Sequence, residues 1–238
     1  MDNLSDTWVY LSASPLFHLT LTLVAFQGAS WLFEKGKRHP LLNPVLGAVL
    51  VVVAVLLGTG TDYASYFEGA QFVHFLLGPA TVSLAIPLYR QWHRVKASAL
   101  AILSAILAGS LAASGTAVAV AWAMGASPEL LATVAPKSVT APVAMAIAEE
   151  LGGLPSLTAV LVIVTGVMGA MLGPLVLDLV GIKDWRARGL AIGTTSHGIG
   201  TARALTVNDT AGAFAGLAMG LNALATALLL PILWGLFF

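Results

Sequence analysis

Long apolar runs dominate this sequence and constrain its fold more than any other feature. They fall at about 16–33, 41–58, 70–89, 97–124, 127–151, 155–180, 188–206 and 211–237. A helix needs about 20 apolar residues to cross a bilayer, and only helices or closed barrels pair every backbone polar group in lipid. The runs are rich in Leu, Ala and Val and show no two-residue alternation, which favours helices. We therefore predict an all-α polytopic protein of the lipid bilayer.

Composition argues against other classes of protein. Only 9% of the 238 residues are charged, whereas a soluble domain carries roughly 25%. The formal net charge of +0 provides no electrostatic attraction to nucleic acid. The absence of Cys excludes disulfides and thiolate metal sites. Because no His, Asp and Glu spacing suggests a metal and no nucleotide-binding loop follows a strand pattern, we expect no metal, no cofactor and no enzymatic activity.

Three basic clusters predict how the chain is oriented in the membrane. They follow the runs that end near residues 33, 89 and 180, and the opposite connections carry acidic residues instead. Because Lys and Arg accumulate in short cytoplasmic loops, we predict a bacterial inner-membrane protein with its N-terminus outside and its C-terminus inside. The 127–151 run must then enter and leave on the outer side. The prediction is about seven transmembrane helices plus one re-entrant or broken element.

The same map predicts an inverted repeat inside a single transmembrane domain, 1–238. The runs within 41–124 cross the membrane in the opposite sense to those within 155–237, so these ranges are the expected halves. The middle run of each half, 70–89 or 188–206, is interrupted by helix breakers. Paired interrupted helices are typical of a transporter's binding site. The similarity between 79–87 and 136–144 leaves a different division of the repeat open.

Helix breakers coincide with hydroxyl side chains in the 127–151 run. Pro136 and Pro142 flank Lys137, Ser138 and Thr140 there. Proline removes a backbone donor and disfavours helix just before it. We therefore expect an unwound, polar segment that takes part in substrate binding.

Two other runs show the same coincidence. Glycines are expected to loosen the 188–206 run, and prolines to interrupt 70–89. Backbone N–H groups and hydroxyls at a helix start suit a carboxylate, although tight helix packing explains any one of these small residues equally well. The expected breakers are Gly193, Gly198, Gly200, Pro79 and Pro87, and the expected binding residues are Thr194, Thr195, Ser196, Thr201, Thr81 and Ser83.

Lys137 and Arg203 are the two basic residues outside the three clusters. A cation inside the membrane costs at least a few kcal/mol unless it faces a cavity or a partner. We predict that both bind an anionic substrate, Arg203 through a bidentate pair. The alternatives are that Lys137 extends to the outer surface near Glu129 and that Arg203 pairs with Asp209.

His197 lies within this polar cluster and is a further predicted substrate-binding residue. An imidazole titrates near neutral pH, so His197 is a candidate for proton coupling. A hydrogen bond that holds two helices together is the alternative explanation.

Three stretches of the chain resemble the LrgB/CidB family of bacterial membrane proteins. They are FLLGPATVSLAIPLYRQW at 75–92, LATVAPKSVTAPVAMAIAEELGG at 131–153 and RGLAIGTTSHGIGTARAL at 188–205. The resemblance implies a fold similar to that of transporters with inverted repeats and crossed, broken helices, and a homo-oligomer such as a dimer. The family's motif positions correspond here to Pro136, Lys137, Ser138, Thr140, Pro142, Ser196, His197, Gly198, Gly200, Thr201 and Arg203.

The resemblance implies two competing functions. One is transport of a small organic anion, a monocarboxylate such as glycolate, glycerate or pyruvate, with possible coupling to a proton or cation. The other is an antiholin-like regulator of murein hydrolase export and cell lysis that acts with a small LrgA/CidA-type membrane partner. The helix breaks and the two intramembrane bases favour the carrier, because a regulator needs only helix surfaces that associate with its partner.

Overall fold

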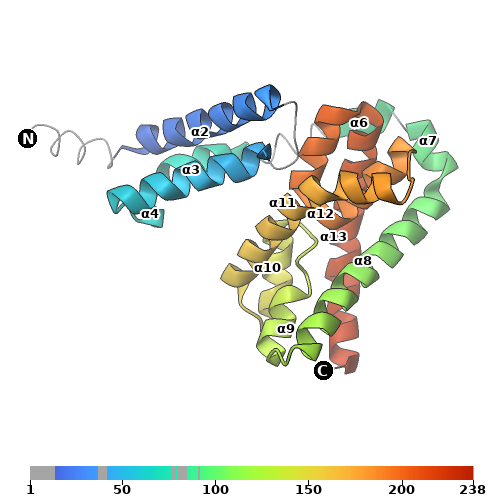
Figure 1. Cartoon of the computed structure of the whole chain (residues 1–238). Coiled ribbons are helices and arrows are strands. Elements are labelled where there is room, and N and C mark those ends of the chain that lie inside the picture. Colours follow the sequence, from blue (N-terminus) through green and yellow to red (C-terminus); the bar gives the residue numbers. More distant parts are fainter. Residues whose placement is uncertain (1–13, 37–41, 77–78, 80–84, 91, 238) are drawn as a thin grey trace, which may run out of the picture. The chain divides into compact units, whose positions relative to one another are not determined.

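The protein is built from α-helices. The structure is a computed structural model and describes residues 14–36, 42–76, 79, 85–90 and 92–237. Every regular element in these residues is a helix (Figure 1), which confirms the predicted all-α class. The chain divides into two compact units, Met1–Ser83 and Leu84–Phe238.

The N-terminal unit contains α2 (Pro15–Lys35), α3 (Pro44–Thr59) and α4 (Tyr63–Phe75), and both α3 and α4 pack on α2. Asn43 caps α3, because its side-chain oxygen accepts hydrogen bonds from the N–H groups of Val45 and Leu46 at 2.9 and 3.2 Å. Gly60 ends the helix in the left-handed region, at φ 66°. Sequence-local capping therefore sets the limits of α3.

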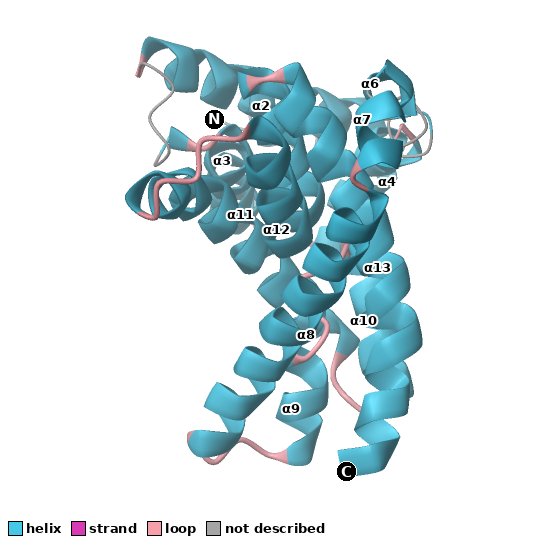
Figure 2. Cartoon of the chain, turned by 90° about the vertical axis from the view of Figure 1, so that its right-hand side faces the viewer, coloured by secondary structure: helices cyan, strands magenta, loops and turns pink. Residues whose placement is uncertain are grey.

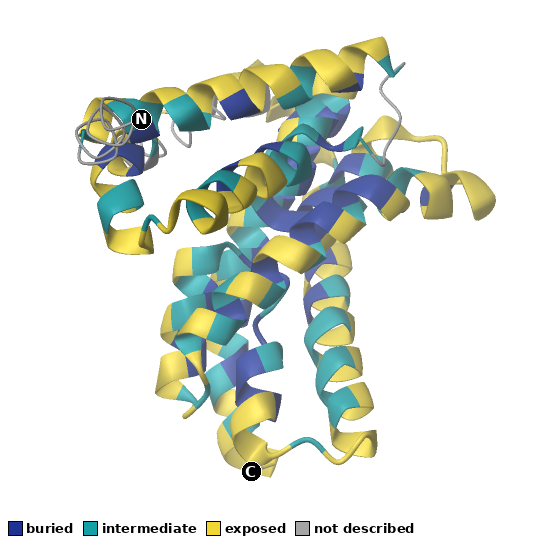
Figure 3. Cartoon of the chain, turned by 60° about the vertical axis from the view of Figure 1, so that its left-hand side comes forward, coloured by how far each residue is buried: buried dark blue, intermediate teal, exposed yellow. Residues whose placement is uncertain are grey.

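The C-terminal unit contains the remaining helices. α12 packs on α11 and α13, and α8 packs on both α12 and α13. Figure 3 shows its buried residues gathered toward the interior and exposed residues along the outer faces. The helices of this unit are α6 (Ala85–Arg90), α7 (Trp92–Ala97), α8 (Ala99–Ala123), α9 (Pro128–Val134), α10 (Ala141–Glu150), α11 (Pro155–Leu179), α12 (Trp185–Val207) and α13 (Asp209–Phe237).

Four helices are long and apolar enough to cross a membrane: α2, α8, α11 and α13. Only 17–33% of the most apolar window of each is buried inside the protein, so their apolar side chains face outward, as lipid contact requires. The shorter helix α3 is also apolar. This is a multi-pass membrane protein. The count of seven spans, the inverted repeat, the single domain and the orientation of the termini stay predictions.

Small residues bring α12 and α13 into close contact. A Cβ at Gly189 would overlap the backbone carbonyl of Ala211, and a Cβ at Gly193 would overlap that of Ala215. Both pairs are spaced four residues apart, which places them on one face of each helix. This arrangement of small residues is the one that lets membrane helices approach closely.

Candidate functional site

The first break in the C-terminal unit separates α9 from α10. Residues 135–140 are not helical, and Pro142 lies in the first turn of α10; loops such as this one are pink in Figure 2. The chain then returns toward α9, because Leu154 N–H donates to Thr133 Oγ1 and Thr158 Oγ1 donates to the Thr133 carbonyl, both at 2.9 Å. The 128–153 segment is therefore a folded-back pair of short helices around an unwound tip.

The second break lies within α12, at His197. This residue has φ 39° and ψ −131°, in a region that L side chains rarely adopt, at a cost of order 1–3 kcal/mol. The ring is buried, and its Nε2 lies 2.9 Å from the Val162 carbonyl of α11. A carbonyl only accepts, so Nε2 carries the proton. The helix-packing hydrogen bond that we weighed against proton coupling is thus present.

Glycine on α11 makes room for this ring. A Cβ at Gly166 would lie 2.5 Å from Cε1 of His197, and a Cβ at Gly169 would overlap the hydroxyl of Ser196. The missing side chains allow α11 to approach the broken turn of α12. Close packing and the hydrogen bond to Val162 together hold the strained conformation.

Asn222 of α13 joins the two breaks. Its side-chain amide donates to the carbonyl of Ser138 at 3.2 Å and to the carbonyl of Thr194 at 3.1 Å. Ser138 lies within the first break and Thr194 in the turn before the second, so the Asn222 side chain contacts the backbone at both breaks. The residue is 1% exposed, and its Oδ1 has no hydrogen-bond partner within the described part of the chain.

A cavity of about 550 Å³ opens beside the two breaks. Lys137 and Ser138 line it from the first break, Thr195 from α12, and Thr165 from α11. The rest of its wall is apolar or glycine, mainly from the 164–177 part of α11. Since α11 is a candidate span, the cavity lies at membrane depth.

Lys137 is the charged group of this cavity. It is half-buried, and its Nζ lies 3.3 Å from the hydroxyl of Ser138. It forms no ion pair with any described carboxylate, Glu129 included; the ion pairs in the described residues are Arg186 with Asp184 and Arg188 with Asp178. An intramembrane ammonium that faces a cavity without a carboxylate partner suits an anion.

The other predicted hydroxyls mostly serve the helices. Thr201 Oγ1 donates to the His197 carbonyl at 2.7 Å, and Thr195 Oγ1 to the Ala191 carbonyl at 2.8 Å. Thr194 lines a second cavity of about 320 Å³ between α8 and α12. Thr140 is the N-cap residue of α10 and forms no side-chain cap. These contacts correspond to the packing explanation, while the binding roles stay predictions.

Several predicted positions lie apart from the Lys137 cavity. Arg203 is half-buried on α12 beyond the break and is not in the cavity lining. Gly198 and Gly200 follow the break directly. Gly193, which we expected to loosen the helix, is itself helical, and its lack of a side chain allows the close contact with Ala215.

The expected third break falls largely on residues that the structure does not describe. Thr81 and Ser83 lie outside the described residues. Pro79 is described and exposed. Pro87 lies inside α6 rather than at a break, because the first turn of a helix tolerates a proline.

Sequence reasoning missed Asn222 and the glycines of α11. Asn222 is an amide in the long apolar run 211–237, and an isolated polar residue in such a run is a general indication of function or helix association. Gly166, Gly169 and Gly173 are spaced three and four residues apart, which is typical of a close helix contact. No group of three or more His, Cys, Asp or Glu residues that could hold a metal occurs in the described chain.

The described helices form a multi-pass α-helical membrane protein, in which two helix breaks lie beside a cavity lined by Lys137. Sequence comparison specifies it further. The chain belongs to the LrgB-like family, which matches residues 22–236. The predicted family resemblance is confirmed.

Relatives match nearly the whole chain. The protein YxaC of Bacillus subtilis is 37% identical over 221 residues, which cover 92% of this chain and 95% of that protein. The holin-like protein CidB of Staphylococcus epidermidis is 34% identical over 229 residues, covering 96% and 99%. The protein of the same name in Staphylococcus aureus is 34% identical over 223 residues, covering 94% and 97%. No solved structure matches this chain.

Proposed function

We propose that this protein is an inner-membrane carrier for a small organic monocarboxylate, bound in the cavity beside the two helix breaks. The observation that supports it is Lys137, a half-buried lysine at membrane depth that has no carboxylate partner in the described residues. A cation there is costly unless an anion compensates it.

The lining favours a small ligand with one carboxylate. Lys137 supplies one positive charge, and Ser138 and Thr165 supply hydroxyls, whereas the Thr195 hydroxyl donates to the Ala191 carbonyl. The remaining wall is apolar or glycine, which suits a short carbon chain and disfavours a second charge. Glycolate, glycerate, pyruvate and lactate have this chemistry. Arg203 and His197 are then left for coupling or structure rather than for contact with the anion in this cavity.

A holin-like regulatory role is the second candidate, and the names of the relatives favour it. CidB of both staphylococci is named a holin-like protein, which matches this function better than transport. In this proposal the chain associates with a small LrgA/CidA-type membrane protein, as a dimer or larger oligomer, and controls murein hydrolase export. The two functions are compatible if the carrier works with that partner.

Uptake into proteoliposomes tests the carrier. Labelled glycolate, glycerate, pyruvate and lactate are offered with and without a pH gradient and with and without the partner. Saturable uptake is expected, and Lys137→Gln should reduce it about 10- to 100-fold, because a charge-assisted hydrogen bond contributes about 1.5–3 kcal/mol. Lys96→Gln removes an equal charge outside the cavity and should leave uptake unchanged. No uptake in any condition, with the partner bound, would refute the carrier.

Release of murein hydrolases tests the regulator. The chain and its partner are expressed in a bacterium that lacks its own copies, and hydrolase activity in the medium is measured by zymography. If hydrolase release is still regulated in the Lys137→Gln variant and no uptake is found, the regulatory function is supported. The Lys137 cavity would then have no role in that function.

A further inference from the structure

The two halves of α12 pack on the same stretch of α13. Before the break, Gly189 lies against the backbone of Ala211, and Gly193 lies against that of Ala215. Residue numbers therefore rise together along the two helices, so the first half of α12 runs parallel to α13. We call this half, residues 185–196, the first limb.

The second limb of α12, residues 198–207, runs the other way. Just after the break, Thr201 Oγ1 lies 3.9 Å from Sδ of Met219, whereas further along the chain Leu205 lies against Gly212. Residue numbers rise along α12 while they fall along α13, so this limb is antiparallel to α13. The helix therefore reverses direction at His197, where its φ is positive.

The composition and the depth of α12 agree with a helix that enters the membrane and returns. It has 23 residues, yet it is not among the described helices that are long and apolar enough to cross a membrane. Its tip, His197, packs on Gly166, which lies near the middle of the candidate span α11. The tip is therefore about halfway along a helix that crosses the bilayer.

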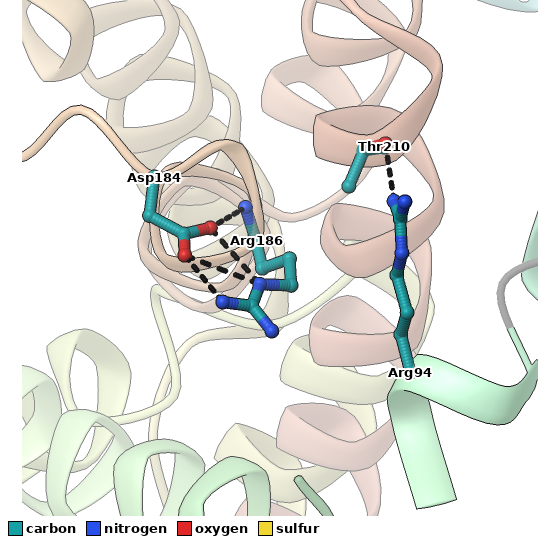
Figure 4. Close-up of polar contacts among 4 residues, drawn as sticks. All are labelled: Arg94, Asp184, Arg186 and Thr210. Carbon is teal, nitrogen blue, oxygen red and sulfur yellow. Dashed lines mark hydrogen bonds and ion pairs between the residues drawn. The ribbon is translucent and has the colours of Figure 1, made fainter. Parts of the chain in front are cut away.

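Both ends of α12 lie at the basic end of the C-terminal unit. Arg94, just before α8, reaches Thr210 Oγ1 at 3.5 Å in the first turn of α13. Arg186 holds Asp184 at the start of α12, and the two contacts border one cleft (Figure 4). Hydrogen bonds from Arg186 lower the pKa of Asp184 to about 2, so this exposed pair is ionised at neutral pH and requires water. The ends of α12 therefore lie at a membrane surface, and its basic residues indicate the cytoplasmic one.

α13 leaves this surface beside α8. Ser110 of α8 and Thr226 of α13 share a hydrogen bond at 2.9 Å, and further along each helix Val118 and Trp234 belong to one apolar cluster. The two helices therefore run parallel, and their far ends lie together in Figure 1. Since both are long and apolar enough to cross a membrane, they lead to the opposite face.

The first limb of α12 borders a path from the basic surface to Lys137. The cavity of about 320 Å³ between α8 and α12 is lined by Ala105 and Gly109 of α8 and, among others, by Ala187, Ala191 and Thr195 of α12. Ala187 lies in the first turn of α12, at the surface end. Ala191 and Thr195 also line the Lys137 cavity. The two cavities share this wall, so together they lead from the surface to Lys137.

We infer that α12 is a re-entrant hairpin and that the anion passes between the cytoplasm and Lys137 along its first limb and α8. The C-terminus then lies outside, rather than inside as the sequence predicts. The 128–153 segment closes the path from the other side, since Asn222 holds both its tip, at Ser138, and the α12 turn, at Thr194. The route rests on the proposed carrier function, whereas the hairpin does not.

Single cysteines in the full, otherwise cysteine-free chain test the hairpin. Right-side-out and inside-out membrane vesicles are treated with a membrane-impermeant methanethiosulfonate that carries a sulfonate. Lys183→Cys and Val207→Cys, at the two ends of α12, should react from the same side, and Ala126→Cys, beyond the far end of α8, from the other. Reaction of Lys183→Cys and Val207→Cys from opposite sides would overturn the hairpin, because α12 would then cross the membrane.

A matched pair on α8 tests the path. Ala105 and Leu107 are both exposed, but Ala105 lines the cavity beside α12 and Leu107 does not. Ala105→Cys should react about tenfold faster than Leu107→Cys, from the side on which Lys183→Cys reacts, because the reagent attacks a thiolate, which forms in water and not in lipid. Equal rates for the two variants would overturn the path.

The inner end of the path has its own probe. Thr195→Cys should react from the side of Lys183→Cys, and faster with the sulfonate reagent than with a cationic reagent of similar size, since Lys137 repels the cation. Reaction from the far side alone would overturn the route. Gel filtration establishes that each variant is folded, and Ala191→Cys, which lines both cavities, replaces Thr195→Cys if that variant is not.

Labelling requires no transport, so the inference and the proposed function fail separately. The expected labelling pattern without uptake of any anion would refute the carrier and support the hairpin and its water-filled path. Uptake without that pattern would refute the route and support the carrier.

Discussion

Asn222 connects the two helix breaks, and replacing it with Leu measures how strongly they depend on each other. The substitution removes the two hydrogen bonds to the carbonyls of Ser138 and Thr194 while keeping a similar side-chain length. A hydrogen bond contributes about 0.6 kcal/mol between membrane helices and up to about 1.5 kcal/mol in soluble proteins. The expected loss is therefore about 1–3 kcal/mol, and because 1 kcal/mol shifts Tm by about 2–4 °C in a chain of this size, Tm should fall by about 2–12 °C.

The control for this prediction is Thr226→Val on the same helix. It removes one buried hydrogen bond, that between Ser110 and Thr226 at 2.9 Å, so the expected loss of stability is about half as large or less. Thermal unfolding in detergent compares both variants with the wild type. A cysteine at Ser138, introduced into this cysteine-free chain, reports local opening through its rate of maleimide labelling.

Labelling of that cysteine should be about tenfold faster with Asn222→Leu, since a loss of 1.4 kcal/mol changes an opening equilibrium by that factor, and unchanged with Thr226→Val. Equal melting temperatures and equal labelling rates for the two variants would refute the reasoning. The amide of Asn222 would then be a local contact of α13 rather than a link between the breaks.

Three other predictions test the packing around the site and the surface ion pair of Asp184 with Arg186. His197→Gly should melt at a higher temperature than His197→Ala, because glycine adopts φ 39° without about 1–3 kcal/mol of strain; equal melting would argue against a strained break. Gly193→Ala should cost about 1–3 kcal/mol through overlap with the Ala215 carbonyl, whereas Gly220→Ala, whose Cβ would meet no atom within 4 Å beyond the adjacent backbone of its own helix, should not destabilise. Asp184 stabilises the fold above its unfolded pKa of 3.8 and loses this effect as pH falls toward about 2; Asp184→Asn should show no such acid dependence in pH-dependent unfolding.

The carrier and the regulator make different demands on the Lys137 cavity. A regulator that acts through helix surfaces does not require an uncompensated lysine at membrane depth, whereas an anion carrier does. The names of the CidB relatives favour the regulator, and the environment of Lys137 favours the carrier. Uptake and hydrolase release in the same Lys137→Gln variant separate the two.

The amino-acid sequence is sufficient to predict the class of protein and the first break. Eight apolar runs in a chain with 9% charged residues favour helices in lipid, because each backbone polar group must be paired locally. Pro136 and Pro142 remove backbone donors within one short stretch, so a break between them follows from local chemistry. The three motifs at 75–92, 131–153 and 188–205 also indicate the family.

Contacts between residues far apart in the sequence determine where α12 breaks and which glycines serve helix packing. No local sequence pattern reveals these contacts. Gly193 and His197 are close in sequence, yet glycine's small size is used for packing on Ala215 and the histidine takes the positive φ. The reason is that Val162 and Gly166, more than 30 residues away, hold the ring. In the same way Asn222 acquires its role only when α13 packs beside both breaks. Backbone chemistry is sufficient for the break between Pro136 and Pro142, whereas tertiary contacts place the break of α12 at a residue whose own backbone preference opposes it.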